Sequence, residues 1–208
     1  MIGRAAFVID RESLVVLSQQ RVERQSHLFA GQGIATSLPV RPAGAAYPAR
    51  ARVNDALYLA RGAQSAGTPG DRSAALDRAR AELTMARSVR PVWGEIEIVA
   101  AFVHVLRDGE DTVATRRALE QSYAQTPYLR TAAAWRVQYG LRYWLALNPE
   151  TRRRVINEAV WLTRIDDQSR TMVFDLARGS AAYKPFILRW LASRGGDADF
   201  GANNRITP

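Results

Sequence analysis

The sequence predicts an all-α protein built of antiparallel helical hairpins. Three observations lead to this prediction. Apolar residues recur at helical spacing from about residue 48 to residue 194, with little interruption. Proline and glycine stand at the ends of these periodic segments, where they stop helices. A pattern of small, large and small residues followed by proline also occurs twice.

The two copies of this pattern lie 36 residues apart and have the same internal offsets of 4, 3 and 5 residues. They are Ala79, Leu83, Ala86, Pro91 and Thr115, Leu119, Ser122, Pro127. A small residue lets two helices approach closely, a large one fills the gap beside it, and proline ends the helix. The pattern resembles the second helix of a tetratricopeptide repeat, whose period is about 34 residues. The resemblance implies an α-solenoid with degenerate repeats; an irregular all-helical domain is the alternative.

Three regions are expected along the chain. Residues 1–47 hold one helix, at about 12–28, and a linker segment rich in glycine and proline. The helical array follows over residues 48–194. The tail of residues 195–208 begins with two glycines and has no periodicity, so it is expected to be flexible.

Within the array, capping and breaking residues place the helix ends. Thr126-Pro127 and Asn148-Pro149 each put a capping residue before a proline, the favoured order for opening a helix. Gly140 lies inside the long helix expected between these prolines and is tolerable there if a neighbouring helix crosses closely. The expected helices are 49–66, from 71 or 73 to 90, 94–107, 112–125, one between Pro127 and Pro149, one after Pro149, 167–178, and 185–194 closed by Gly195.

Composition bounds the class of protein. The 208 residues suffice for one ordinary domain or for three or four hairpins. The absence of cysteine excludes disulfides, thiolate catalysis and Cys-ligated zinc. No run approaches the roughly 18 apolar residues of a membrane span, so the sequence as written predicts a cytoplasmic protein.

The net charge of +9 raises nucleic acid or another anionic polymer as a partner. All 29 basic residues except Lys184 are arginine, and they are dispersed along the chain. Such a dispersed excess is more typical of a solvated surface than of a phosphate-binding patch.

Few residues combine into a pattern that carries chemistry. His27 and His104 lie 77 residues apart without ligand spacing, so no metal or other cofactor is expected, and we predict that the protein is not an enzyme. The run Arg152, Arg153 and Arg154 lies in the first turn after Pro149, where the helix dipole disfavours cations. An anion bound at this helix N-terminus would explain the run, which is our candidate anion-binding site.

Aromatic and arginine residues supply the candidates for partner binding. Most of the five tryptophans are expected to pack between helices. One or two of them could line the concave face of the array, where such residues form binding surfaces. The candidates are Trp93, Trp135, Arg136 and Tyr139.

Residues from about 53 to 191 resemble bacterial tetratricopeptide-like proteins found with exopolysaccharide biosynthesis and export machinery. The likeness is carried by the segments ALDRARAELTMARSVRPVWGEIEIVAAFV, TPYLRTAAAW and NPETRRRVINEAVWL. It implies a non-catalytic accessory role through protein contacts and an association with the cell envelope. Members of this group begin with a membrane anchor, which is not found in this sequence.

The function predicted from the sequence is therefore a protein-interaction scaffold or adaptor. The alternatives are a helical protein that binds nucleic acid or another anionic polymer, based on the charge, and a sugar-modifying enzyme. The sequence identifies neither the partner nor the oligomeric state.

Overall fold

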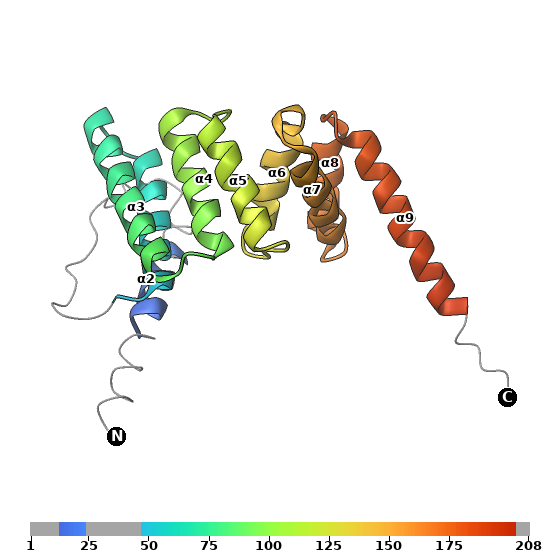
Figure 1. Ribbon diagram of the computed structural model, residues 1–208, viewed down its shortest axis with the longest axis horizontal. Coiled ribbons are helices and arrows are strands. Elements are labelled where there is room, and N and C mark those ends of the chain that lie inside the picture. Colours follow the sequence, from blue (N-terminus) through green and yellow to red (C-terminus); the bar gives the residue numbers. More distant parts are fainter. Residues whose placement is uncertain (1–12, 24–46, 203–208) are drawn as a thin grey trace, which may run out of the picture. The chain divides into compact units, whose positions relative to one another are not determined.

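The computed structural model describes residues 13–23 and 47–202, with side chains up to residue 194. Throughout these ranges the regular structure is helical and includes no strand, which confirms the all-α prediction (Figure 1). The chain divides into two compact units, Met1–Gln125 and Thr126–Pro208. No helix in the described ranges is long and apolar enough to cross a membrane.

The first unit contains a helix at residues 13–23 and four longer helices. α2 packs against α3 and α4, and α4 also packs against α5 (Figure 1). The helix at 13–23 agrees with the helix predicted at 12–28, whose remaining residues lie outside the described ranges, as does most of the predicted linker. The four helices are α2 (Ala49–Gln64), α3 (Pro69–Val89), α4 (Gly94–Asp108) and α5 (Val113–Gln125).

The predicted boundaries in the first unit hold except at the start of α3. This helix begins at Pro69 rather than at Asp71 or Ser73, because Thr68 is its N-cap and accepts a hydrogen bond from the Asp71 backbone N–H (3.1 Å). Proline is well suited to the next position because it has no N–H to satisfy. At the other end of the next helix, α4 stops at Gly109, whose φ of 99° lies in the left-handed region that favours glycine.

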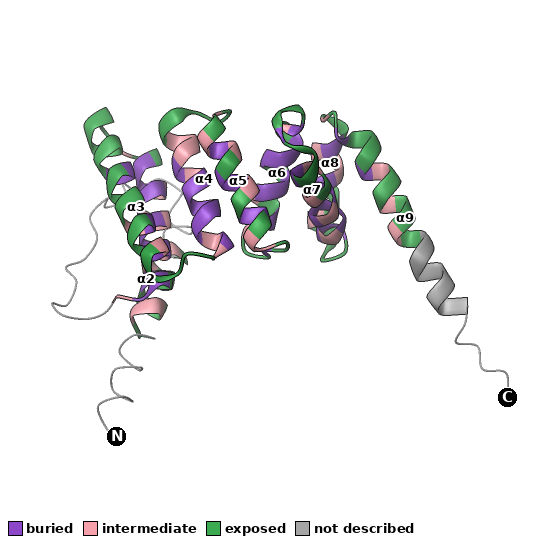
Figure 2. Cartoon of the chain, in the orientation of Figure 1, coloured by how far each residue is buried: buried purple, intermediate pink, exposed green. Residues whose placement is uncertain are grey.

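The residues of the small–large–small pattern are buried in both copies. Figure 2 shows the buried residues gathered on one side of each helix. Ala79 and Ala86 are fully buried, as predicted for residues at a helix contact. The other four members are Leu83, Thr115, Leu119 and Ser122. Ser122 also donates a hydrogen bond to the Gly94 carbonyl of α4 (3.0 Å), so this small residue joins α5 to α4.

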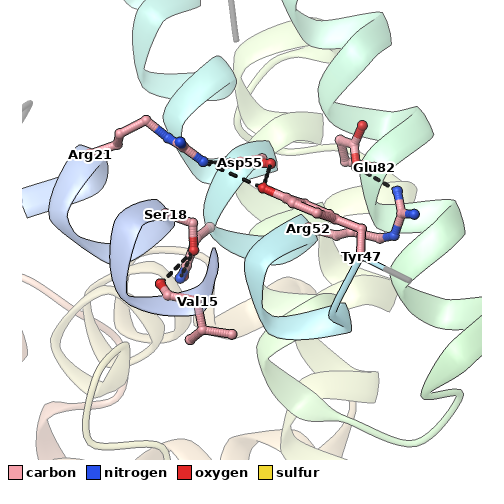
Figure 3. A network of polar contacts seen from close by, with 8 residues as sticks. Val15, Ser18, Arg21, Tyr47, Arg52, Asp55 and Glu82 are labelled. Atoms are coloured by element: carbon pink, nitrogen blue, oxygen red, sulfur yellow. Dashed lines mark hydrogen bonds and ion pairs between the residues drawn. The ribbon is translucent and has the colours of Figure 1, made fainter. Parts of the chain in front are cut away.

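A buried carboxylate attaches the first described helix to α2. Asp55 is 1% exposed and accepts hydrogen bonds from Arg21 (2.6 Å) and from the Tyr47 hydroxyl (2.5 Å) (Figure 3). Burial and the hydrogen bond to Asp55 raise the pKa of Tyr47 to about 12. These contacts join residues far apart in the sequence, which no periodicity could have indicated.

The second unit contains four α-helices and one short 3₁₀ helix. α7 packs against α6, α8 and α9. Asn148 is the N-cap of α7, as predicted, and accepts a hydrogen bond from the Thr151 backbone N–H (2.8 Å). The elements are α6 (Ala133–Arg142), η1 (Trp144–Ala146), α7 (Pro149–Leu162), α8 (Asp167–Arg178) and α9 (Tyr183–Ala202).

One long helix between Pro127 and Pro149 was a wrong prediction. Thr126-Pro127 opens no helix, and α6 begins only at Ala133. The reason is the buried side chain of Arg136, which donates hydrogen bonds to the backbone carbonyls of Thr126 (2.9 Å) and Pro127 (3.2 Å). These bonds hold the preceding segment in a non-helical path.

Glu158 of α7 completes this arrangement. Its carboxylate forms an ion pair with Arg136 (Nε–Oε2 3.1 Å) and accepts a hydrogen bond from the Leu129 backbone N–H (3.2 Å). Both charged side chains are fully buried. The pair therefore joins α6, α7 and the segment before α6.

The prediction that Gly195 closes the last helix was also wrong. α9 continues through Gly195 to Ala202, so the first part of the predicted flexible tail is helical, and residues 203–208 lie outside the described ranges. Glycine in a helix interior costs about 1 kcal/mol relative to alanine, but it ends a helix only where the backbone leaves the helical conformation.

Gly140 lies where α6 meets α7, and we predict that Gly140→Ala destabilises the protein. A Cβ at this position would lie 2.5 Å from Cγ2 and 2.9 Å from Cγ1 of the buried Val155. Overpacking of this kind costs about 1–3 kcal/mol, against a propensity gain of about 1 kcal/mol. Urea unfolding measures the difference.

Gly70→Ala is the control, because Gly70 lies in α3 and a Cβ there would be 3.8 Å from its nearest neighbour, Thr68 Oγ1. We expect this variant to be neutral or slightly more stable. Adding Val155→Ala should recover stability only in the Gly140→Ala background. Equal responses of the two glycine variants would contradict a close crossing at Gly140.

Removing one member of the buried ion pair should be costly. We expect Arg136→Met or Glu158→Gln to lower the free energy of unfolding by about 3–5 kcal/mol, because each leaves a buried charge without its partner. Arg178→Met breaks an exposed ion pair with Asp175 (2.9 Å) and should cost less than about 1 kcal/mol. If chemical denaturation gave similar losses for the Arg136 and Arg178 variants, the structural role of the buried pair would be refuted.

Candidate functional site

The excess positive charge is concentrated in the second unit. Residues 47–125 contain 11 Arg and 10 Asp or Glu, a net charge of +1. Residues 126–194 contain 12 Arg or Lys and 5 Asp or Glu, a net charge of +7. Arginine is dispersed along the chain, as the sequence indicated, but the acidic residues that would balance it are not. The basic region is therefore the second unit.

A cleft in this unit, which we call the arginine cleft, collects four arginines from α7 and α9. Its volume of about 730 Å³ lies within the range of about 300–1,000 Å³ that is usual for ligand sites. The charged and polar lining residues are Glu150, Arg152, Arg153, Arg154, Asn157 and Arg189, and the apolar ones are Pro127, Trp144, Ile156 and Pro185.

Arg152 is held by neutral acceptors. Its Nε donates to the Trp144 carbonyl (2.9 Å) and its Nη2 to the Leu145 carbonyl (2.7 Å), and the guanidinium lies 5.7 Å from the centre of the Trp144 ring. Carbonyl oxygens fix the side chain without neutralising it. Arg152 consequently retains its full positive charge at the edge of the cleft.

Arg153 and Arg154 share a carboxylate with each other. Glu150 accepts from Arg153 Nη2 and from Arg154 Nε, with shortest distances of 2.8 Å in both pairs. The hydrogen bonds from Arg153, and secondly from Arg154, hold the pKa of Glu150 below its ordinary value. One negative charge thus serves two arginines, and the pair keeps a net positive charge.

Arg189 of α9 faces the same cleft and bonds to α7. Its Nε donates to Asn157 Oδ1 (3.0 Å). Arg154 and Arg189 are therefore both fixed through Nε. Within the described part of the chain, their Nη nitrogens donate no hydrogen bond to the protein. These terminal groups remain for solvent or for a ligand.

The structure brings the predicted anion-binding residues Arg152, Arg153 and Arg154 to one cleft. The contacts to Glu150 and to the Trp144 and Leu145 carbonyls account for cations in the first turn of α7, so the helix dipole alone no longer calls for a bound anion. Anion binding by these residues stays a prediction.

Sequence reasoning missed Arg189, which lies more than 30 residues from the Arg152–Arg154 run. No local pattern links the two segments, because only the packing of α9 against α7 brings them together.

Two of the predicted partner-binding residues are not on a surface. Arg136 is 0% and Tyr139 is 6% exposed, so the prediction that they contact a partner was wrong. Arg136 is fixed by its ion pair with Glu158, and the Tyr139 ring stacks on Trp135 (5.3 Å). Trp135 is half-buried beside it.

Trp93, the fourth candidate, belongs to the first unit and is also half-buried. The guanidinium groups of Arg90 and Arg50 lie 4.7 Å and 5.9 Å from the centre of its ring. The four candidates are thus distributed over two units, and only Trp93 and Trp135 retain exposed area.

A smaller cleft of about 400 Å³ in the second unit repeats the combination of arginine with aromatic rings. Arg164 donates to the Ser193 carbonyl (2.7 Å), and Arg170 donates to the Thr163 carbonyl (3.1 Å). The Arg194 guanidinium lies 4.8 Å from the centre of the Trp190 ring. Arg164, Arg170 and Arg194 line this cleft together with Thr163, Phe174, Trp190 and Ser193.

Comparison of the chain with protein-family models, with curated proteins and with solved structures found no match.

The pKa of Glu150 provides a test of the contacts in the arginine cleft. We expect its carboxyl group to titrate below 4.5 in an NMR titration, because the charged form is stabilised by Arg153 and Arg154. In Arg153→Gln/Arg154→Gln the pKa should rise toward 4.5. Since the folded-state pKa is depressed, the stabilisation is present above the unfolded-state pKa and is lost as pH falls through the folded-state value. An unchanged pKa in the double variant would exclude these pairs in solution.

Proposed function

We propose that this protein is a non-catalytic interaction scaffold whose basic second unit holds an anionic segment of a protein partner. The observation that carries the proposal is the charge imbalance between the units, +7 over residues 126–194 against +1 over residues 47–125. A strongly basic unit beside a nearly neutral one favours association with a partner of opposite charge.

The helices of the first unit support the scaffold part of the proposal. We infer that α2–α3 and α4–α5 are antiparallel hairpins that form a degenerate repeat of the tetratricopeptide kind. Burial of Ala79, Leu83 and Ala86 in α3, and of Thr115, Leu119 and Ser122 in α5, favours this inference. Repeats of this kind stack into extended surfaces that bind other proteins.

The resemblance of residues 53–191 to tetratricopeptide-like proteins of exopolysaccharide machinery favours a partner in bacterial envelope polysaccharide assembly. Under this proposal, association with the envelope follows from the partner, since no described helix could span a membrane.

Nucleic acid is the second candidate partner, favoured by the same net charge of +7. Binding to phosphates would release counterions, so affinity would fall steeply with salt. A protein partner that makes apolar contacts as well would retain more of its affinity at high salt.

Capture of partners from cells that make the protein, with and without nuclease, tests the proposal. We expect a specific protein to be retained after nuclease treatment. We also expect Arg130→Glu/Lys184→Glu to weaken capture, because both side chains are exposed in the second unit.

The control Arg78→Glu/Arg117→Glu makes the same change in net charge on exposed residues of the first unit and should have little effect. Capture that disappears with nuclease would favour nucleic acid. Equal loss in both charge variants would refute a role specific to the second unit.

A further inference from the structure

We propose that the arginine cleft binds a short acidic peptide segment whose carboxylates pair with Arg154 and Arg189. An apolar side chain of the same segment packs against the cleft walls. This inference rests on the proposed function and names the chemistry of the partner segment and the residues that take it.

Two forked cations are already oriented in the cleft. Arg154 is anchored through Nε to Glu150 (2.8 Å), and Arg189 through Nε to Asn157 (3.0 Å). Guanidinium groups bind carboxylates through paired N–H donors, and the Nη nitrogens of both residues are available for this. Because intramolecular bonds already restrict both side chains, a ligand loses less conformational entropy in binding them.

Glu150 shows that the cleft accepts a carboxylate. It lies between Arg153 and Arg154 and bonds to both, as an acidic side chain of a ligand would. The four arginines outnumber this single acid, so the cleft retains a net charge of +3. Charge complementarity therefore requires further carboxylates from the partner.

Apolar residues distinguish this cleft from a simple cationic patch. Pro127 and Pro185 are exposed and line the cleft together with Trp144 and Ile156, which are mostly buried. An apolar side chain of the ligand would cover these prolines, which gains hydrophobic free energy in addition to the ion pairs. A peptide that combines acidic and apolar residues matches both parts of the lining.

Nucleic acid fits the cleft less well. The ionised Glu150 would repel a phosphate placed between Arg153 and Arg154. Single-stranded nucleic acid also binds by stacking its bases on open aromatic faces. Trp144 offers no such face, since it is 8% exposed and the Arg152 guanidinium lies 5.7 Å from its ring centre.

Fluorescence anisotropy with labelled eight-residue peptides tests the proposal on the full chain. The probe contains four Glu and one central Leu; control peptides replace Glu by Gln or Leu by Ser. We expect saturable binding of the probe, binding about tenfold weaker or absent for the Gln peptide, and binding several-fold weaker for the Ser peptide.

Three variants connect binding to the cleft. Arg154→Gln/Arg189→Gln should weaken probe binding about tenfold or more, while thermal melts report whether the fold is retained. Glu150→Gln should strengthen binding several-fold, because it removes the carboxylate that competes for Arg153 and Arg154. A merely structural role of Glu150 predicts no gain, so this variant keeps the test valid even if the double variant is less stable. Arg78→Gln/Arg117→Gln is the control for net charge.

The proposal is overturned if the probe does not bind, or if Arg154→Gln/Arg189→Gln and the control variant weaken it equally. A single-stranded oligonucleotide or an oligouronate that binds the same cleft more tightly than the peptide would also overturn it. If partner capture still depended on Arg130 and Lys184 while the double variant behaved as wild type, the scaffold function would stand and only the role of this cleft would be rejected.

Discussion

The second unit depends on one buried ion pair, Arg136 with Glu158. Its two charges are fully removed from solvent, and the remaining donors of Arg136 bond to the Thr126 and Pro127 carbonyls. A buried pair of this kind is tolerated only when hydrogen bonds satisfy its other polar atoms. Here these bonds also set the path of the chain into α6 and attach α7 to it. The first turn of α7, which carries the arginine cleft, is therefore positioned by residues that contact no ligand.

Arginine has two roles in this protein. Several guanidinium groups bond to backbone carbonyls of other segments, as Arg72 does to Leu106 (2.6 Å), Arg152 to Leu145 and Arg170 to Thr163. Lysine has no planar fork with which to bridge two such acceptors. Because a carbonyl is neutral, an arginine fixed in this way still contributes its charge to the surface. A structural role and a basic binding surface are consequently compatible in the same residues.

Much of the fold could be predicted from local patterns. Periodicity and capping residues placed most helices, including α7 behind Asn148 and α8 at residues 167–178. The prediction failed at Thr126-Pro127, where a good opening signal is overridden by hydrogen bonds from Arg136. For the candidate site, the Arg152–Arg154 run was identified from the sequence, whereas Arg189 was not, because its place in the cleft depends on the packing of α9 against α7.

The sequence by itself determined the helical class, the close approach at Gly140 and the excess of arginine, since each of these follows from local composition and spacing. Only the tertiary structure decided which arginines are buried, which bond to carbonyls and which surround a cleft. Arg136 and Arg154 are the same residue type on amphipathic helices, and the pattern around them does not separate their roles. The difference arises from Glu158 and Glu150, because one carboxylate is buried with its arginine and the other is half exposed beside the cleft.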